Sequence, residues 1–67
     1  MRIELNGRAV EITREATVAD AVAASGAEAR RGIAVAVEGE VVPRSEWDTT
    51  PLHPGQHVEV LHAVQGG

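Results

Sequence analysis

The feature that most constrains the fold is the dipeptide Asn6–Gly7, which lies between two short runs of alternating apolar and polar residues. Asn-Gly is a preferred sequence of the two-residue type I′ turn, because both turn residues need positive φ angles. A two-residue loop sets Ile3 opposite Val10 on one face and Arg2 opposite Glu11 on the other. The N-terminal segment is therefore predicted to form a β-hairpin with one face in the core.

A short helix is predicted after this hairpin. Thr17 is a suitable N-cap, and Asp20 three residues later gives an acidic version of the capping box. Gly26 is a suitable C-terminal stop. The apolar positions between cap and stop follow helical spacing and predict one buried stripe. They are Val18, Ala21 and Val22.

Three further strands are predicted in the rest of the chain. Ile33–Val37 is a continuous apolar run with the length of a buried strand. Val41–Pro43 is predicted to be a short edge strand, because Pro43 has no N–H to donate, and His57–Val64 is the last strand. Residues 44–50 are expected to be irregular or to form one helical turn. This order predicts an α+β fold, with a mixed sheet of four to five strands and one main helix packed on one face.

The composition argues against several functions. The 67 residues contain no cysteine, so disulfides, thiolate metal sites and cysteine nucleophiles are excluded. A net charge of −4 and a single aromatic residue, Trp47, argue against a nucleic-acid partner. No run approaches the roughly 20 apolar residues of a membrane span, and the N-terminus lacks the apolar block of a signal peptide. We therefore expect a cytoplasmic protein without a membrane partner, and a monomer when free.

The polar residues do not form a recognisable catalytic or metal-binding motif. His57 and His62 are five positions apart on a predicted strand, which places them on opposite faces, and His53 lies in a Pro-rich turn. Glu38 and Glu40 belong to a predicted turn, where acidic side chains are ordinarily solvated. The sequence therefore predicts no catalytic residue, no metal site and no bound cofactor.

The sequence ends in Val64-Gln65-Gly66-Gly67. The two glycines have no Cβ, so this stretch can enter a narrow cleft and adopt backbone angles closed to other residues. Three extended residues span about 10 Å, enough to place a carboxylate in another protein's site. We therefore expect a single domain over residues 1–64 and a flexible tail over residues 65–67. A frayed terminus without a role is the simpler alternative.

The chain resembles the ThiS family of sulfur carrier proteins, which belongs to the ubiquitin-like β-grasp superfamily. The resemblance covers essentially the whole chain, and its most specific element is the pattern Val-Pro-Arg-x-x-Trp. It implies a β-grasp fold, in which the first and last strands pair in parallel. The segments that carry it are Asn6–Gly7, Thr17–Val18, Ile33–Val37, Val42–Trp47, Pro54–Val60 and Ala63–Gly67.

The resemblance also implies that the chain is a protein substrate and not an enzyme. In such families a ThiF-like adenylyltransferase uses ATP and Mg²⁺ to convert the terminal carboxylate, here that of Gly67, to an acyl-adenylate. Sulfur from a cysteine desulfurase or another donor then gives a thiocarboxylate, which a ThiG-like thiazole synthase uses to build the thiazole of thiamine. Gly66 would give steric clearance in the partner's channel, and Val64 and Gln65 would help to seat the tail.

Two alternatives remain open at this point. The same ending occurs in carriers for other products, such as the small subunit of molybdopterin synthase, or carriers of cysteine and secondary-metabolite pathways. A second alternative is a non-covalent β-grasp binding module, which a reading frame continuing past Gly67 would favour.

Overall fold

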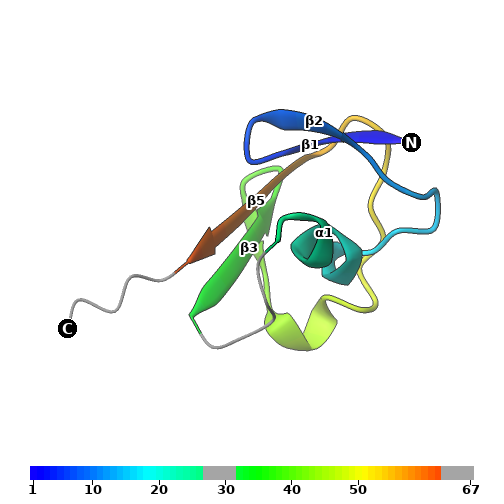
Figure 1. Cartoon of the computed structure of the whole chain (residues 1–67). Helices are drawn as coiled ribbons and strands as arrows, with labels where there is room; N and C mark the ends of the chain where they lie inside the picture. Colours follow the sequence, from blue (N-terminus) through cyan, green and yellow to red (C-terminus); the bar gives the residue numbers. More distant parts are fainter. Residues whose placement is uncertain (27–31, 63–67) are drawn as a thin grey trace.

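The computed structural model describes residues 1–26 and 32–62, which form a mixed five-stranded sheet with one helix across one face (Figure 1). The strand order is β2-β1-β5-β3-β4, and only the central pair β1 and β5 is parallel. This arrangement confirms the predicted α+β class and the β-grasp topology. The elements are β1 (Arg2–Leu5), β2 (Arg8–Glu11), α1 (Val18–Ala24), β3 (Ile33–Val37), β4 (Glu40–Val42), the 3₁₀ turn η1 (Arg44–Glu46) and β5 (His57–His62).

The N-terminal hairpin has the register that the sequence predicts. Ile3 lies opposite Val10 and Arg2 opposite Glu11. The turn residues Asn6–Gly7 have φ angles of 51° and 82°, as a type I′ turn requires. The Arg2 Nε atom lies 3.0 Å from Oε2 of Glu11, but both side chains are largely exposed, so this pair contributes little to stability.

Helix α1 begins and ends where the sequence predicts. The backbone N–H of Thr17 donates to the carboxylate of Asp20 at 2.8 Å, which completes the capping box. The chain leaves the helix through Gly26, which has a φ of 84°. A helix of 7 residues is too short to be stable alone, so its packing on the sheet must hold it.

The region after β3 differs from the prediction in one detail. β4 begins at Glu40 and ends at Val42, one residue earlier at each end than expected, and it lies at the sheet edge. Glu38 and Gly39 alone form the turn, with φ angles of 51° and 83°, so Glu40 already pairs with β3. Pro43 has no N–H for the ladder and instead precedes η1.

Trp47 closes one end of the core. It is 5% exposed, and its indole Nε1–H donates to the carbonyl of Val42 at 3.0 Å, so its polar group is satisfied. The guanidinium of Arg44 lies 5.6 Å from the ring centroid, within cation–π range. The Val-Pro-Arg-x-x-Trp segment thereby connects the edge strand to the core.

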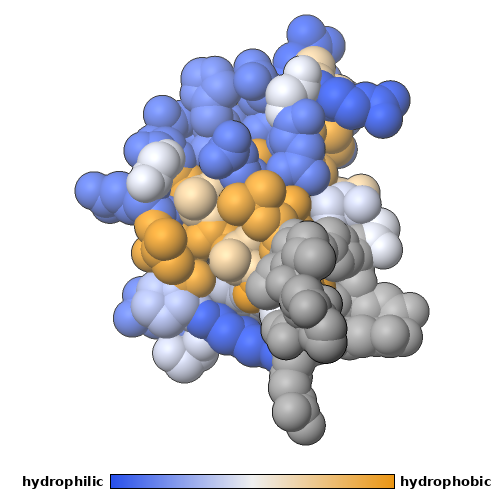
Figure 2. All heavy atoms as spheres, turned by 90° about the vertical axis from the view of Figure 1, so that its left-hand side faces the viewer, coloured by the Kyte–Doolittle hydropathy of each residue, from blue (hydrophilic) through white to orange (hydrophobic). Residues whose placement is uncertain are grey.

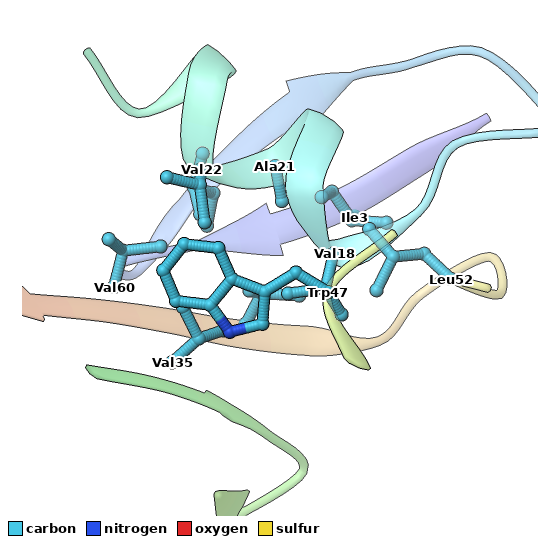
Figure 3. Close-up of a cluster of buried hydrophobic side chains, with 10 residues drawn as sticks. Ile3, Val18, Ala21, Val22, Val35, Trp47, Leu52 and Val60 are labelled. Carbon is cyan, nitrogen blue, oxygen red and sulfur yellow. The ribbon is translucent and has the colours of Figure 1, made fainter. Parts of the chain in front are cut away.

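The core lies between the sheet and α1, and side chains from the strands, the helix and the η1 region point toward one another in it (Figure 3). Within the described residues, no helix has the length and apolar character needed to cross a membrane. The predicted connection at residues 27–31 and the predicted strand residues 63–64 lie outside the described residues. The buried core consists of Ile3, Leu5, Val18, Ala21, Val22, Val35, Trp47, Leu52, Val58 and Val60.

Two leucines provide a matched test of this core. Leu52 is 3% exposed in the core, whereas Leu61 on β5 is 55% exposed. We expect Leu52→Ala to lower the free energy of unfolding by about 3 kcal/mol, because it removes buried apolar surface and leaves a cavity. Leu61→Ala should change it by less than about 0.5 kcal/mol. Guanidinium denaturation of both variants measures this, and equal losses would contradict the assignment of the core.

Candidate functional site on the open face and at the end of β5

The residues predicted to react or to seat the tail directly follow strand β5. Val64, Gln65, Gly66 and Gly67 lie outside the described residues, and the division of the chain at residue 64 stays a prediction. The structure does describe β5 up to His62 and everything that holds this strand. The candidate site is therefore built from β5 and the surface around its C-terminal end.

Strand β5 has backbone partners on both sides at its start. On one side it pairs with β3, from Val37 opposite Val58 to Ile33 opposite His62. On the other side the ladder with β1 ends where Leu5 lies opposite Val58. Beyond that point the chain of β1 turns away into the N-terminal hairpin.

The side chain of Asn6 continues the sheet where the β1 ladder ends. The backbone N–H of Val60 donates to Oδ1 of Asn6 at 2.8 Å, and Nδ2 of Asn6 donates to the carbonyl of Val60 at 3.3 Å. The backbone N–H of Asn6 also donates to the carbonyl of Val58 at 2.9 Å. The amide thus satisfies both backbone groups of a residue that is only 5% exposed. A buried backbone group left unpaired costs about 1–3 kcal/mol.

An apolar patch covers part of the sheet face opposite α1, which we call the open face. Because side chains alternate along a strand, Ala34 and Leu61 share this face, and so do Ala36 and Val41. Figure 2 shows the patch, with hydrophilic residues above and below it. Val41 is 74% exposed and Leu61 55%, and they are the large exposed hydrophobic residues of the described chain. These four residues form the open-face patch: Ala34, Ala36, Val41 and Leu61.

The open-face patch adjoins the end of β5 and an acidic side chain. Leu61 belongs to the patch and is three residues before Val64 in the sequence. Glu59, exposed on β5, is paired with Ala36 and therefore lies beside the patch. An exposed apolar patch of this kind, next to the strand end from which a reactive tail is predicted to continue, is typical of a protein-binding surface.

A second cluster on the open face joins the start of β5 to its neighbours. His57 lies between two carboxylates: its Nδ1 is 3.2 Å from Oε2 of Glu38, and its Nε2 is 3.4 Å from Oε1 of Glu4. The Glu38 carboxylate also accepts the backbone N–H of His57 at 2.7 Å. This backbone hydrogen bond, followed by the bond from the His57 side chain, lowers the pKa of Glu38 below its ordinary value.

The geometry of this cluster fits a structural role. All three side chains are about half exposed or more. Among the described residues, no group of three or more His, Cys, Asp or Glu side chains is arranged so that it could hold a metal ion. Glu38 was expected to be simply solvated, as acids in turns usually are. It is exposed, but it also binds the β5 backbone. Sequence analysis could not find this contact, because it joins a turn residue to a strand residue 19 positions away in the sequence.

Taken together, fold and surface define a ubiquitin-like β-grasp domain whose last strand leads directly into the predicted tail. The sequence model of the ThiS family matches residues 3–67. The chain therefore belongs to the ThiS family, a family of small sulfur carriers in thiamine biosynthesis that are not enzymes. Members of this family interact in general with ThiF-like adenylyltransferases and thiazole synthases.

Two solved structures are similar to this chain over its whole length. One is the crystal structure of the thiamine biosynthesis protein ThiS from Geobacter metallireducens, with 26% identity, full coverage of both chains and a TM-score of 0.81. The other is an NMR solution structure of a thiamine biosynthesis protein from the same organism. It has 28% identity and a TM-score of 0.79, and the match covers 100% of this chain and 88% of that one. A search of curated protein sequences finds no match.

The lowered pKa of Glu38 predicts how stability depends on pH. A carboxyl group with a lower pKa in the folded state stabilises the fold above its unfolded pKa, and this contribution is lost as pH falls through the folded value. The difference in unfolding free energy between the wild type and Glu38→Gln should therefore shrink as pH falls below 4.5. Urea denaturation at several acidic pH values measures it.

Glu40 provides the control for this titration. Its carboxylate has no hydrogen bond or ion pair within residues 1–26 and 32–62, although it lies two residues from Glu38. As the control for loss of a carboxylate, Glu40→Gln should therefore change the free energy of unfolding at neutral pH by less than about 0.5 kcal/mol. A Glu38→Gln profile parallel to that of the wild type down to acid unfolding would contradict the assigned hydrogen bonds.

Proposed function

We propose that this chain carries sulfur for thiazole formation as a thiocarboxylate on Gly67. The observation that supports this most directly is the family match, which extends through Gly67 and thus includes the predicted tail. The sequence contains no cysteine, so the protein has no thiol of its own with which to carry sulfur. The C-terminal carboxylate is then the group to be converted.

The proposed chemistry proceeds in three steps from that carboxylate. A carboxylate resists nucleophiles until one of its oxygens becomes part of a good leaving group. In the first step, a carboxylate oxygen of Gly67 attacks the α-phosphate of ATP, and pyrophosphate leaves. In the second, the terminal sulfur of a persulfide made by a cysteine desulfurase attacks the acyl carbon, and AMP leaves. A thiol then reduces the S–S bond of this acyl persulfide, which releases the Gly67 thiocarboxylate. The partner adenylyltransferase supplies the Mg²⁺ and the phosphate contacts for the first step.

The residue types of the predicted tail suit this reaction. Gly66 and Gly67 lack side chains, so they can pass through a channel that excludes bulkier residues. Val64 and Gln65 would seat the tail at the channel entrance. The resulting thiocarboxylate stays ionised at neutral pH and is a soft nucleophile, which suits sulfur delivery to a thiazole synthase without release of free sulfide.

We further propose that the open-face patch docks on the adenylyltransferase. The patch includes Leu61, so a partner that covers it also receives the tail. Docking there removes Val41 and Leu61, which are 74% and 55% exposed, from water. Glu59 beside the patch, together with a net charge of −4, fits a partner surface with an apolar centre and basic groups at its edge.

The absence of cysteine allows a direct test of the sulfur carrier function. The protein is incubated with ATP, Mg²⁺, cysteine, a cysteine desulfurase and a ThiF-like adenylyltransferase, and is then treated with a thiol-specific alkylating reagent. Intact-mass analysis with fragmentation should show one label on Gly67, because any label must report a newly formed sulfur nucleophile. Deleting Gly67 should abolish labelling and leave the circular dichroism spectrum unchanged.

Two results of this experiment would overturn the proposal. One is an unlabelled wild-type chain when the same enzymes label a control carrier, which would favour a non-covalent β-grasp module. The other is full labelling after deletion of Gly67, which would show that a different group carries the sulfur. Conversion by a thiazole synthase, compared with other sulfur-accepting enzymes, then separates thiazole formation from molybdopterin and the other pathways.

The docking surface has its own test. Val41→Asp places a charge on the most exposed residue of the patch, on the edge strand β4, and should raise the KM for this protein in the adenylation reaction about 10-fold, with little change in kcat. Ala9→Asp adds the same charge on the exposed edge strand β2, away from the patch, and should change KM less than about 2-fold. Equal effects of both variants would contradict docking through the patch.

A further inference from the structure

The amide of Asn6 has a role that its place in a tight turn does not explain. A type I′ turn needs a residue that tolerates positive φ at this position, and glycine satisfies that need as well as asparagine. The Asn6 side chain instead reaches across to β5 and makes two hydrogen bonds with the backbone of Val60, 54 residues away in the sequence. It therefore acts as one extra rung of the β1–β5 ladder.

This rung lies where the strand would otherwise become one-sided. The backbone N–H and C=O of Val60 point toward β1, as their two hydrogen bonds with the Asn6 amide show. The backbone ladder of β1 does not reach Val60, since its last pair is Leu5 and Val58. Without the Asn6 amide, two-sided support of β5 would end two residues earlier.

We propose that Asn6 is a positioning residue for the sulfur-carrying tail. By fixing Val60 from the β1 side, its amide sets the direction of the last residues of β5, Leu61 and His62, and with it the direction in which the chain continues after the strand. When the domain is docked, this direction determines how often the Gly67 carboxylate reaches the adenylation site. The proposal rests on the proposed carrier function and adds to it a residue far from the tail in sequence.

If Asn6 positions the tail, its loss should change the adenylation kinetics differently from a change in the open-face patch. Loss of the hydrogen bonds between Asn6 and Val60 leaves the open-face patch intact, so the domain should bind its partner normally and KM should stay within about 2-fold. A tail that starts from a less defined direction places its carboxylate correctly less often, so kcat should fall at least about 5-fold. A merely structural role, in which a fraction of the protein is unfolded, would not produce this separation.

The matched variants are Asn6→Gly and Glu38→Gly. Both replace the first residue of a type I′ turn with glycine, and the φ angle of the native residue is 51° in both. Both also remove a side chain that binds the β5 backbone, at Val60 in one case and at His57 in the other. Only Asn6→Gly acts near the tail, so only this variant should lower kcat in a steady-state adenylation assay with a ThiF-like enzyme.

A second measurement tests the hydrogen bonds between Asn6 and Val60 in the absence of a partner enzyme. Hydrogen exchange followed by NMR should show at least about 10-fold faster exchange of the Val60 amide in Asn6→Gly, with amides of the β3–β4 hairpin unchanged. Asn6→Asp keeps the turn preference and the acceptor for the Val60 N–H, but it has no donor for the Val60 carbonyl. It should keep the Val60 amide protected and still lower kcat at least about 2-fold, which assigns the effect to the carbonyl contact.

The outcomes separate this inference from the carrier function. If the wild type is adenylated and both Asn6 variants match it in kcat, the positioning role is wrong and the carrier function stands. Unchanged Val60 exchange in Asn6→Gly would show that the amide does not hold the strand, which also overturns the inference. If the wild type is not adenylated by an enzyme competent on a control carrier, the carrier function fails, and the positioning role fails with it.

Discussion

The parallel pairing of β1 with β5 is the interaction on which the rest of the structure depends. It joins Glu4 to His57 and Leu5 to Val58, at opposite ends of the sequence, so its formation closes a loop of about 50 residues. The entropy cost of that closure is offset by burial of apolar side chains from both strands, among them Ile3 and Val60, against α1. Once the pair has formed, β2 lies on one side of it and the β3–β4 hairpin on the other, and the helix has a surface on which to pack.

The same pairing divides the molecule into a face for stability and a face for contact. Val58 and Val60 are buried, whereas Glu59 and the exposed Leu61 alternate with them on the open face. A shift of one residue in register would exchange the two sets, exposing the core residues and burying a carboxylate. The alternation that builds the core therefore also places Leu61 in the open-face patch. Residues that stabilise the core and residues of the proposed docking surface thus alternate along one strand.

The sequence predicts most of the fold because its signals are local. Asn6–Gly7 set the first hairpin register, and Thr17 with Asp20 set the helix start, each within a few residues. Strand β4 starts one residue earlier than predicted, because a two-residue turn is enough to reverse the chain. The contacts of Asn6 with Val60 and of His57 with two glutamates were not predicted, since they exist only after distant strands pair. For Gly66 and Gly67, residue type and family resemblance supported a role, and the family match includes them, but their geometry is not part of the described structure.

The turns of both hairpins connect their own strands and also bind the backbone of β5. Asn6 and Glu38 each open a type I′ turn, and each uses its side chain to bind the backbone of β5, one near its C-terminal end and the other at its start. Turn formation alone asks only for tolerance of positive φ, which leaves the side chain free for a second purpose. The chain has only 67 residues, and its core consists mostly of small aliphatic side chains. Such contacts hold the central strand without any additional buried apolar residues. A carrier must present its tail from a fixed base while the tail itself stays narrow enough for a partner's channel. In the proposed carrier, fixing β5 through side chains of the turns would meet the first demand, and the residue types of Gly66 and Gly67 would meet the second.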